Sequence, residues 1–84
     1  YKGTNTTATY SLVEDLQVKH RRAELYLNQY NKITYGVYVK SDREESWLGN
    51  GIKNNEEAIR LCLEFVSRDC TPQEFKYDFE RGRI

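Results

Sequence analysis

The chain has 84 residues, which is the length of one small domain. Its thirteen basic and thirteen acidic residues cancel, and this balance argues against a general polyanion binder, whose affinity depends on clustered lysine and arginine. No apolar run approaches the ~18 residues that a membrane-spanning helix needs, so no membrane partner is predicted. Hydrophobic residues make up 38% of the chain, so its seven tyrosines, three phenylalanines and one tryptophan must supply much of the core.

The first nine residues are polar and rich in threonine. They predict either a flexible tail or an edge strand that reaches Tyr10. Residues 10–84 are then expected to form a single domain. Because the chain begins with Tyr1 rather than methionine, we expect a trimmed or excised piece in which any upstream signal is not visible.

A long helix is predicted over residues 11–30. Ser11 and Glu14 have the spacing of a capping box, in which a hydroxyl and a carboxylate satisfy backbone amides at a helix start. No glycine or proline interrupts the stretch, and apolar side chains recur three and four residues apart. These side chains are Leu12, Leu16, Ala23, Leu27 and Tyr30. Asn31 and Lys32 are expected to form the turn that ends the helix.

The strongest two-residue alternation lies over residues 33–39. One side would carry Ile33, Tyr35, Val37 and Val39, and the other Thr34, Gly36, Tyr38 and Lys40. This pattern predicts an antiparallel strand with one buried side. A polar loop over residues 41–45 and a return strand over residues 46–49 would complete a hairpin.

A second helix is predicted to begin at Asn54 or Asn55, either of which can cap it, with Glu56 and Glu57 in its first turn. Its apolar residues cover more than half of its circumference, which is typical of a helix covered on two sides. They are Ala58, Ile59, Leu61, Cys62, Leu63, Phe65 and Val66. We therefore expect this to be the most buried helix.

The last part of the chain fits two patterns. Thr71 and Glu74 have the spacing of a capping box, with Pro72 at the first helical position. Residues 75–80, however, alternate between aromatic and charged side chains, as an edge strand does. We favour the strand.

Together these elements predict an α+β fold in which two helices pack on a small antiparallel sheet, in the order (β)αββα(β). If both bracketed strands form, this is the βαββαβ order of a ferredoxin-like sandwich. If neither forms, a two-stranded sheet carries both helices, which is marginal on its own. That outcome would require an extra strand or a partner that completes the sheet.

Cys62 and Cys70 lie eight residues apart, within or at the end of the second predicted helix. At ~1.5 Å per residue their Cα atoms would be about 12 Å apart, whereas a disulfide needs less than ~7 Å. We expect free thiols, unless the helix ends before Ser67 and the chain folds back. Free thiols favour a reducing compartment, here the cytoplasm or the nucleus.

No catalytic site, metal site or cofactor is predicted. The single histidine, His20, is followed by two arginines, and no serine or cysteine lies in a nucleophile motif. One histidine and two distant cysteines do not make a zinc site. We therefore expect a protein that is not an enzyme.

Two features favour nucleic-acid binding. Lys19, Arg21 and Arg22 form a basic group on the first predicted helix, and Lys40 lies at the end of the predicted strand. Tyr38 would lie on a sheet face, where its ring can stack on a base. This strand is similar to the aromatic strand of RNA-recognition motifs, but there a helix follows, and here a second strand does.

Three short stretches resemble a DNA-binding family. Tyr35-Gly36-Val37, Trp47-Leu48-Gly49 and Glu56-Glu57-Ala58 follow in order, as in AP2-type domains, where a Tyr-x-Gly-Val strand, a Trp-Leu-Gly strand and a Glu-Glu-Ala helix occur. The resemblance implies a ββα unit that binds DNA. The interval between Val37 and Trp47 is too short for the family's middle strand. The arginines and tryptophan that its sheet presents to the major groove are also missing.

The function we favour is a protein-interaction module, such as an inhibitor, adaptor or small subunit. If helices cover one face of the sheet, Tyr38 and Leu48 would lie on the other, with Trp47 and Tyr35 as further contact residues. Exposed apolar patches often mark contact sites, and tyrosine and tryptophan are enriched in them. A protein partner is therefore predicted, with nucleic acid as the alternative. A thin sheet can also pair with a second copy across a two-fold axis.

Overall fold

The computed structural model describes residues 10–49 and 51–84. Within these residues a four-stranded antiparallel sheet comes first and two helices follow. The strands are β1 (Tyr10–Val18), β2 (Arg21–Asn28), β3 (Tyr35–Ser41) and β4 (Glu44–Leu48), and the helices are α1 (Asn55–Ser67) and α2 (Pro72–Glu80). Strands that are neighbours in the chain are also neighbours in the sheet, in the order β1-β2-β3-β4.

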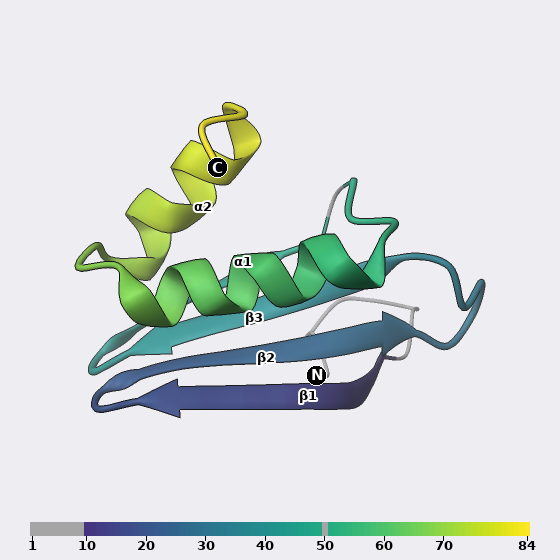
Figure 1. Cartoon of the computed structure of the whole chain (residues 1–84), viewed down its shortest axis with the longest axis horizontal. Helices are drawn as coiled ribbons and strands as arrows, with labels where there is room; N and C mark the ends of the chain where they lie inside the picture. Colours follow the sequence, from purple (N-terminus) through teal and green to yellow (C-terminus); the bar gives the residue numbers. More distant parts are fainter. Residues whose placement is uncertain (1–9, 50) are drawn as a thin grey trace.

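Both helices pack on the same face of the sheet (Figure 1). α1 contacts β1, β2 and β3, whereas α2 contacts β3 and β4. We call the covered side of the sheet the helix face and the opposite side the outer face. Because successive residues of a strand point to opposite faces, the strand register tells which side chains lie on each.

The hydrophobic core lies between the helix face and the two helices. Its fully buried side chains come from three strands, from the loop before α1 and from both helices. They are Ala23, Leu25, Val37, Val39, Leu48, Ile52, Ala58, Leu61, Phe65 and Phe75. In β2 and β3 they occupy alternate positions, which is the period of strands with one buried side.

The helix predicted over residues 11–30 is wrong, because this stretch forms β1, a tight turn and β2. The expected capping residues, Ser11 and Glu14, both lie in β1. Leu16 and Ala23, which the predicted helix places on one apolar stripe, are opposite each other in neighbouring strands. Many residues here have good helix propensity. That preference is worth at most about 0.7 kcal/mol per residue, and burying one side of β2 in the core outweighs it.

The strand favoured over residues 75–80 is also wrong, because these residues belong to α2. The capping box is the pattern that forms. The backbone amide of Glu74 donates to the Thr71 hydroxyl at 3.1 Å, and the backbone amide of Thr71 donates to the Glu74 carboxylate at 2.9 Å. Phe75, in the first turn, is fully buried with its ring centre 5.3 Å from that of Phe65. The capping box and the burial of Phe75 therefore make this segment a helix and not a strand.

Other predictions are confirmed. The fold is α+β with two helices on an antiparallel sheet, and β3 and β4 form a hairpin. Asn54 caps α1, since its side chain accepts from the amides of Glu56 and Glu57 at 2.8 and 3.3 Å. The ferredoxin-like order is wrong, because the four strands precede both helices. The possible strand before Tyr10 falls outside the described residues, although Tyr10 itself begins β1. No described helix has the length and apolarity needed to cross a membrane.

Both cysteines are free, as predicted. Cys62 is buried in α1, and this burial, with a smaller effect of the Glu14 carboxylate, raises the pKa of its thiol to about 12. Cys70 is half-buried in the connection between α1 and α2. The two thiols therefore have different access to solvent.

We expect iodoacetamide at about pH 8 to alkylate Cys70 while the folded protein keeps Cys62 unmodified. The thiolate is the reactive form, and a pKa of about 12 leaves Cys62 protonated at that pH. Mass spectrometry of digested samples, with and without urea, measures both sites. The Cys70→Ser variant should then take up no label until it is unfolded. Labelling of Cys62 in the folded protein at the rate of Cys70 would contradict this expectation.

Candidate protein-binding face of the sheet

The outer face carries a cluster of aromatic rings next to a network of charged side chains. These residues come from alternate positions of all four strands. They include Tyr10, Asp15 and Gln17 on β1; Arg22, Glu24 and Tyr26 on β2; Gly36, Tyr38 and Lys40 on β3; and Glu45 and Trp47 on β4.

Trp47 is the centre of the aromatic cluster. Its ring lies directly over Gly36, where a Cβ atom would stand 2.1 Å from the ring carbon Cζ2. At Gly49 a Cβ atom would stand 2.5 Å from the indole Nε1. Both glycines therefore leave room that the indole occupies. The rings of Tyr10 and Tyr26 flank it, with centroids 4.9 and 5.9 Å from that of Trp47.

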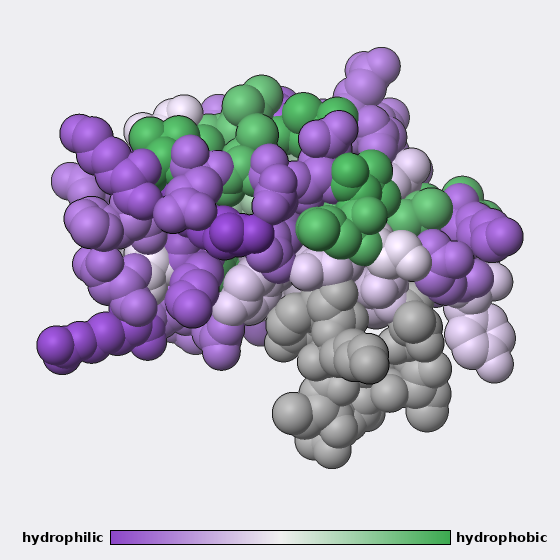
Figure 2. Space-filling model, turned by 90° about the horizontal axis from the view of Figure 1, so that it is seen from below, coloured by the Kyte–Doolittle hydropathy of each residue, from purple (hydrophilic) through white to green (hydrophobic). Residues whose placement is uncertain are grey.

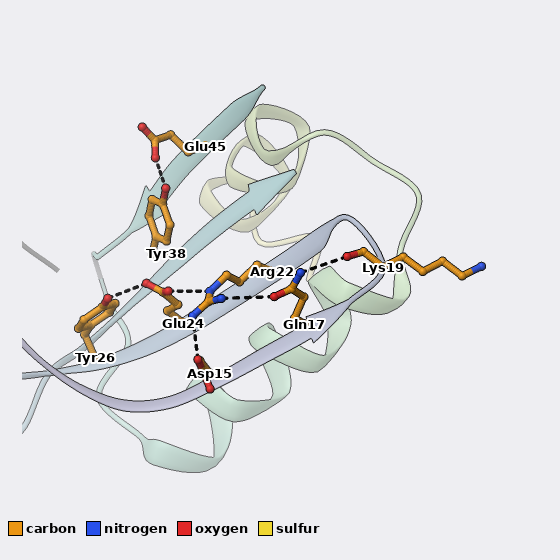
Figure 3. Close-up of polar contacts among 8 residues, drawn as sticks. All are labelled: Asp15, Gln17, Lys19, Arg22, Glu24, Tyr26, Tyr38 and Glu45. Atoms are coloured by element: carbon orange, nitrogen blue, oxygen red, sulfur yellow. Dashed lines mark hydrogen bonds and ion pairs between the residues drawn. The ribbon is translucent and has the colours of Figure 1, made fainter. Parts of the chain in front are cut away.

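Ion pairs fix the polar side chains beside these rings (Figure 3). Arg22 donates from Nε to Glu24 at 2.7 Å and from Nη2 to Asp15 at 2.8 Å. It also donates from Nη1 to the Gln17 side chain at 3.3 Å. The hydrogen bond to Glu24 is the largest of the effects that raise the pKa of Arg22 above its ordinary value. The guanidinium is thus held across β1 and β2.

Tyr26 connects the charged network to the rings. Its hydroxyl donates to Glu24 at 2.6 Å, and its side chain is only 8% exposed. Two effects raise the pKa of Tyr26 to about 12. Burial of the phenol away from water is the larger, and the hydrogen bond to Glu24 is the next. Because this raised pKa belongs to the folded state, stability from Tyr26 is complete below about pH 10 and is lost as pH rises to about 12.

Tyr38 and Lys40 extend the outer face along β3. Tyr38 lies opposite Trp47 in the sheet, and its hydroxyl donates to the carboxylate of Glu45 (Figure 3). Lys40 is exposed and lies opposite Arg22 on β2 and opposite Glu45 on β4. The face therefore combines aromatic rings with charges of both signs.

Two of the four residues predicted to bind a partner, Tyr38 and Trp47, lie together on the outer face. Leu48 does not. It is 1% exposed and pairs with Val37 in the core, so its predicted place on the outer face is wrong. Tyr35 is half-buried on the helix face, where it packs against the core. The register of the β3–β4 hairpin sets the positions of Trp47 and Leu48, and the pairing of Tyr35 with Leu27 of β2 sets that of Tyr35.

The four residues suggested for nucleic-acid binding are not gathered in one place. Arg21 lies on the helix face, where its Nε donates to the carbonyl of Phe65 at 2.8 Å and its guanidinium carbon is 4.0 Å from the centre of that ring. Lys19 lies in the β1–β2 turn with a φ of 57°. Arg22 and Lys40 are neighbours on the outer face, but two carboxylates already contact Arg22.

The structure also forms a hollow of about 360 Å³ that the sequence did not suggest. It lies where the β1–β2 turn, the β3–β4 turn and the α1–α2 connection meet. In it His20 Nδ1 is 3.7 Å from the Asp42 carboxylate, and Arg21 Nη2 is 3.9 Å from the Cys70 sulfur. His20 and Cys70 thus contact different partners, and no group of three metal-binding side chains occurs among the described residues. Among the described residues that line this hollow, no side chains form the nucleophile–base pair of an enzyme.

The resemblance to AP2-type domains depends only on the short stretches of sequence quoted above. In the structure two of their residues, Gly36 and Gly49, make room for the ring of Trp47. No protein-family model, curated protein or solved structure matches the chain.

Proposed function

We propose that this chain is a non-enzymatic interaction module that binds a partner protein through the outer face of its sheet. The ring cluster of Trp47, Tyr10 and Tyr26, set beside the ion-paired Arg22, carries the proposal. Tryptophan, tyrosine and arginine are the residue types that most often dominate the energy of protein interfaces.

The outer face is held in position by contacts within the chain. Trp47 is seated over Gly36, and Arg22 is fixed by two carboxylates on different strands. Side chains that are already ordered lose little rotamer freedom on binding, so more of their contact energy appears as affinity. Charges of both signs, such as Lys40 and Glu45 opposite each other, fit a protein surface better than a uniform polyphosphate.

The two free thiols support a place of action in a reducing compartment, the cytoplasm or the nucleus. Cys62 adds little to this argument, because its buried, protonated thiol serves as a small apolar core residue in any compartment.

We expect Tyr38→Ala to weaken capture of the partner about tenfold or more, since truncating a central interface tyrosine costs about 2 kcal/mol. The tagged protein captures its partner from a lysate of its native source, and quantitative mass spectrometry compares variants. Tyr77→Ala is the matched control, because this ring is 42% exposed but lies on α2, away from the outer face. Circular dichroism establishes that both variants fold. Equal capture by Tyr38→Ala and the unchanged chain would refute binding through this face.

Nucleic-acid binding is a second candidate, favoured by the pairing of Lys40 with Arg22 beside the aromatic rings. Asp15 and Glu24 offset the charge of Arg22, so the electrostatic attraction available to phosphate is small. Fluorescence anisotropy with labelled duplex DNA and single-stranded RNA, at about 50 and 300 mM salt, tests it. This candidate requires affinity that falls steeply with salt, and a flat response would exclude it.

A further inference from the structure

β1 is an edge strand, with β2 on one side and no described strand on the other. The opposite edge of the sheet, along β4, is approached by the start of α2. There the backbone amide of Gln73 donates to the Glu44 carboxylate at 3.3 Å, and its side chain donates to the carbonyl of Glu45 at 3.5 Å. β1 forms the lower border of the sheet in Figure 1. An edge of this kind is a template for pairing with another strand.

Apolar side chains concentrate along this edge. Of the seven large hydrophobic side chains that are exposed in the described part of the chain, three lie on β1. They are Leu12, Val13 and Val18, which are 53%, 43% and 47% exposed. Leu63, 51% exposed, lies on α1, which packs beside β1. Figure 2 views the molecule from this side and shows hydrophobic areas among the hydrophilic ones. A neighbour that covers them removes apolar surface from water.

The charges along β1 complement those of a second, antiparallel copy. Glu14 and Asp15 lie near the middle of the strand, and Lys19 and His20 follow its end. In an antiparallel pair, the middle of one strand can therefore approach the basic end of the other. Neither Glu14 nor Lys19 belongs to an ion pair within the described residues, so both charges are available for such a contact.

The same charges select the register of the pairing. A two-fold axis along the sheet normal keeps helix-face residues opposite helix-face residues, so the axis must pass through one residue position of β1. An axis at Glu14 or Asp15 sets like charges opposite each other, which is destabilising. An axis at Gln17 sets both acids opposite Lys19 and His20, which lie in the β1–β2 turn and not in the strand. An axis at Leu16 places Glu14 opposite Val18 and Asp15 opposite Gln17 of the second copy, next to its Lys19.

We infer that the chain forms a homodimer in which β1 pairs with β1 of a second copy about a two-fold axis at Leu16. The register shift between Leu12 and Glu14 interrupts the first part of the strand and leaves residues 14–18 for regular pairing. The two sheets then join into one, with all helices on the same side. This dimer uses the edge of β1 and not the outer face, so it does not depend on the function proposed above.

Charge reversal tests the dimer and its register together. Sedimentation equilibrium from about 10 to 500 µM should show a monomer–dimer equilibrium for the unchanged chain. Glu14→Lys and Lys19→Glu should each raise the dimer dissociation constant about tenfold or more, because the two-fold axis applies every change twice. The double variant with both changes should dimerise again. Glu80→Lys and Lys53→Glu make the same charge changes at exposed positions away from β1 and should have no effect.

Amide hydrogen exchange gives a second measurement that does not depend on any variant. Exchange at residues 14–18 should slow as protein concentration rises, whereas exchange in β4 should not change. A monomer throughout the concentration range would overturn the inference. Dimers that survive both single reversals, or a double variant that stays monomeric, would equally overturn it.

Discussion

Replacing Phe65 with alanine is expected to lower the free energy of unfolding by about 3–5 kcal/mol. The ring is fully buried, and its centre lies 5.3 Å from that of Phe75 in an edge-on contact. Its other side supports the guanidinium of Arg21, whose carbon is 4.0 Å from the ring centre. The substitution therefore leaves a cavity where α1, α2 and β2 meet. A domain of this size has a total stability of about 4–13 kcal/mol, so the loss is a large fraction of it.

Urea denaturation followed by far-ultraviolet circular dichroism measures this loss. Leu63→Ala is the matched control, since it shortens a large side chain on the same helix at a position that is 51% exposed. We expect that control to change the free energy of unfolding by less than about 1 kcal/mol. Comparable losses in the two variants would mean that Phe65 is not the central packing residue of the core.

Where local signals were sufficient, the sequence predicted the fold correctly. The alternation over residues 33–39 identified β3, and Asn54 with the two glutamates after it identified the start of α1. Both signals depend on residues that are close in the chain. The capping box at Thr71 is just as local. The alternation over residues 75–80 favours a strand instead, and the burial of Phe75 in α2 overrides that alternation.

β1 and β2 were missed because their sequence fits two periods. Leu16 and Ala23 suit a helical stripe, and no glycine or asparagine marks the turn between the strands. Lys19 instead adopts a φ of 57°, a conformation that glycine or asparagine adopts more readily. One signal was available: Leu25, which is fully buried, fits no helical stripe but alternates with Ala23 and Leu27.

The composition of the outer face was only partly predictable, because it depends on strand register. Ser41 pairs with Glu44, so the hairpin turn has two residues instead of the five in the predicted loop. This shorter turn places Trp47 opposite Tyr38 and sends Leu48 into the core. The ion pairs of Arg22 depend in turn on the β1–β2 pairing, which the predicted helix excluded.

The close contact between Gly36 and the ring of Trp47 leads to the second prediction of a large loss of stability. We expect Gly36→Ala to lower the free energy of unfolding by about 2–3 kcal/mol, the usual cost of an extra group in a filled space. The added Cβ would stand 2.1 and 2.2 Å from two carbons of the indole, so Trp47 must leave its position between Tyr10 and Tyr26. Urea denaturation measures the loss, and a red shift of tryptophan emission reports the displaced ring.

A double-mutant cycle separates this clash from any strain in the backbone of β3. In a Trp47→Ala background the space above Gly36 is empty, so adding Gly36→Ala should cost less than about 1 kcal/mol. The difference between the two costs is the energy of the contact between position 36 and the indole. An equal cost in both backgrounds would instead place the penalty in the strand itself. In that case the presence of glycine at position 36 would not be explained by the space that the ring of Trp47 occupies.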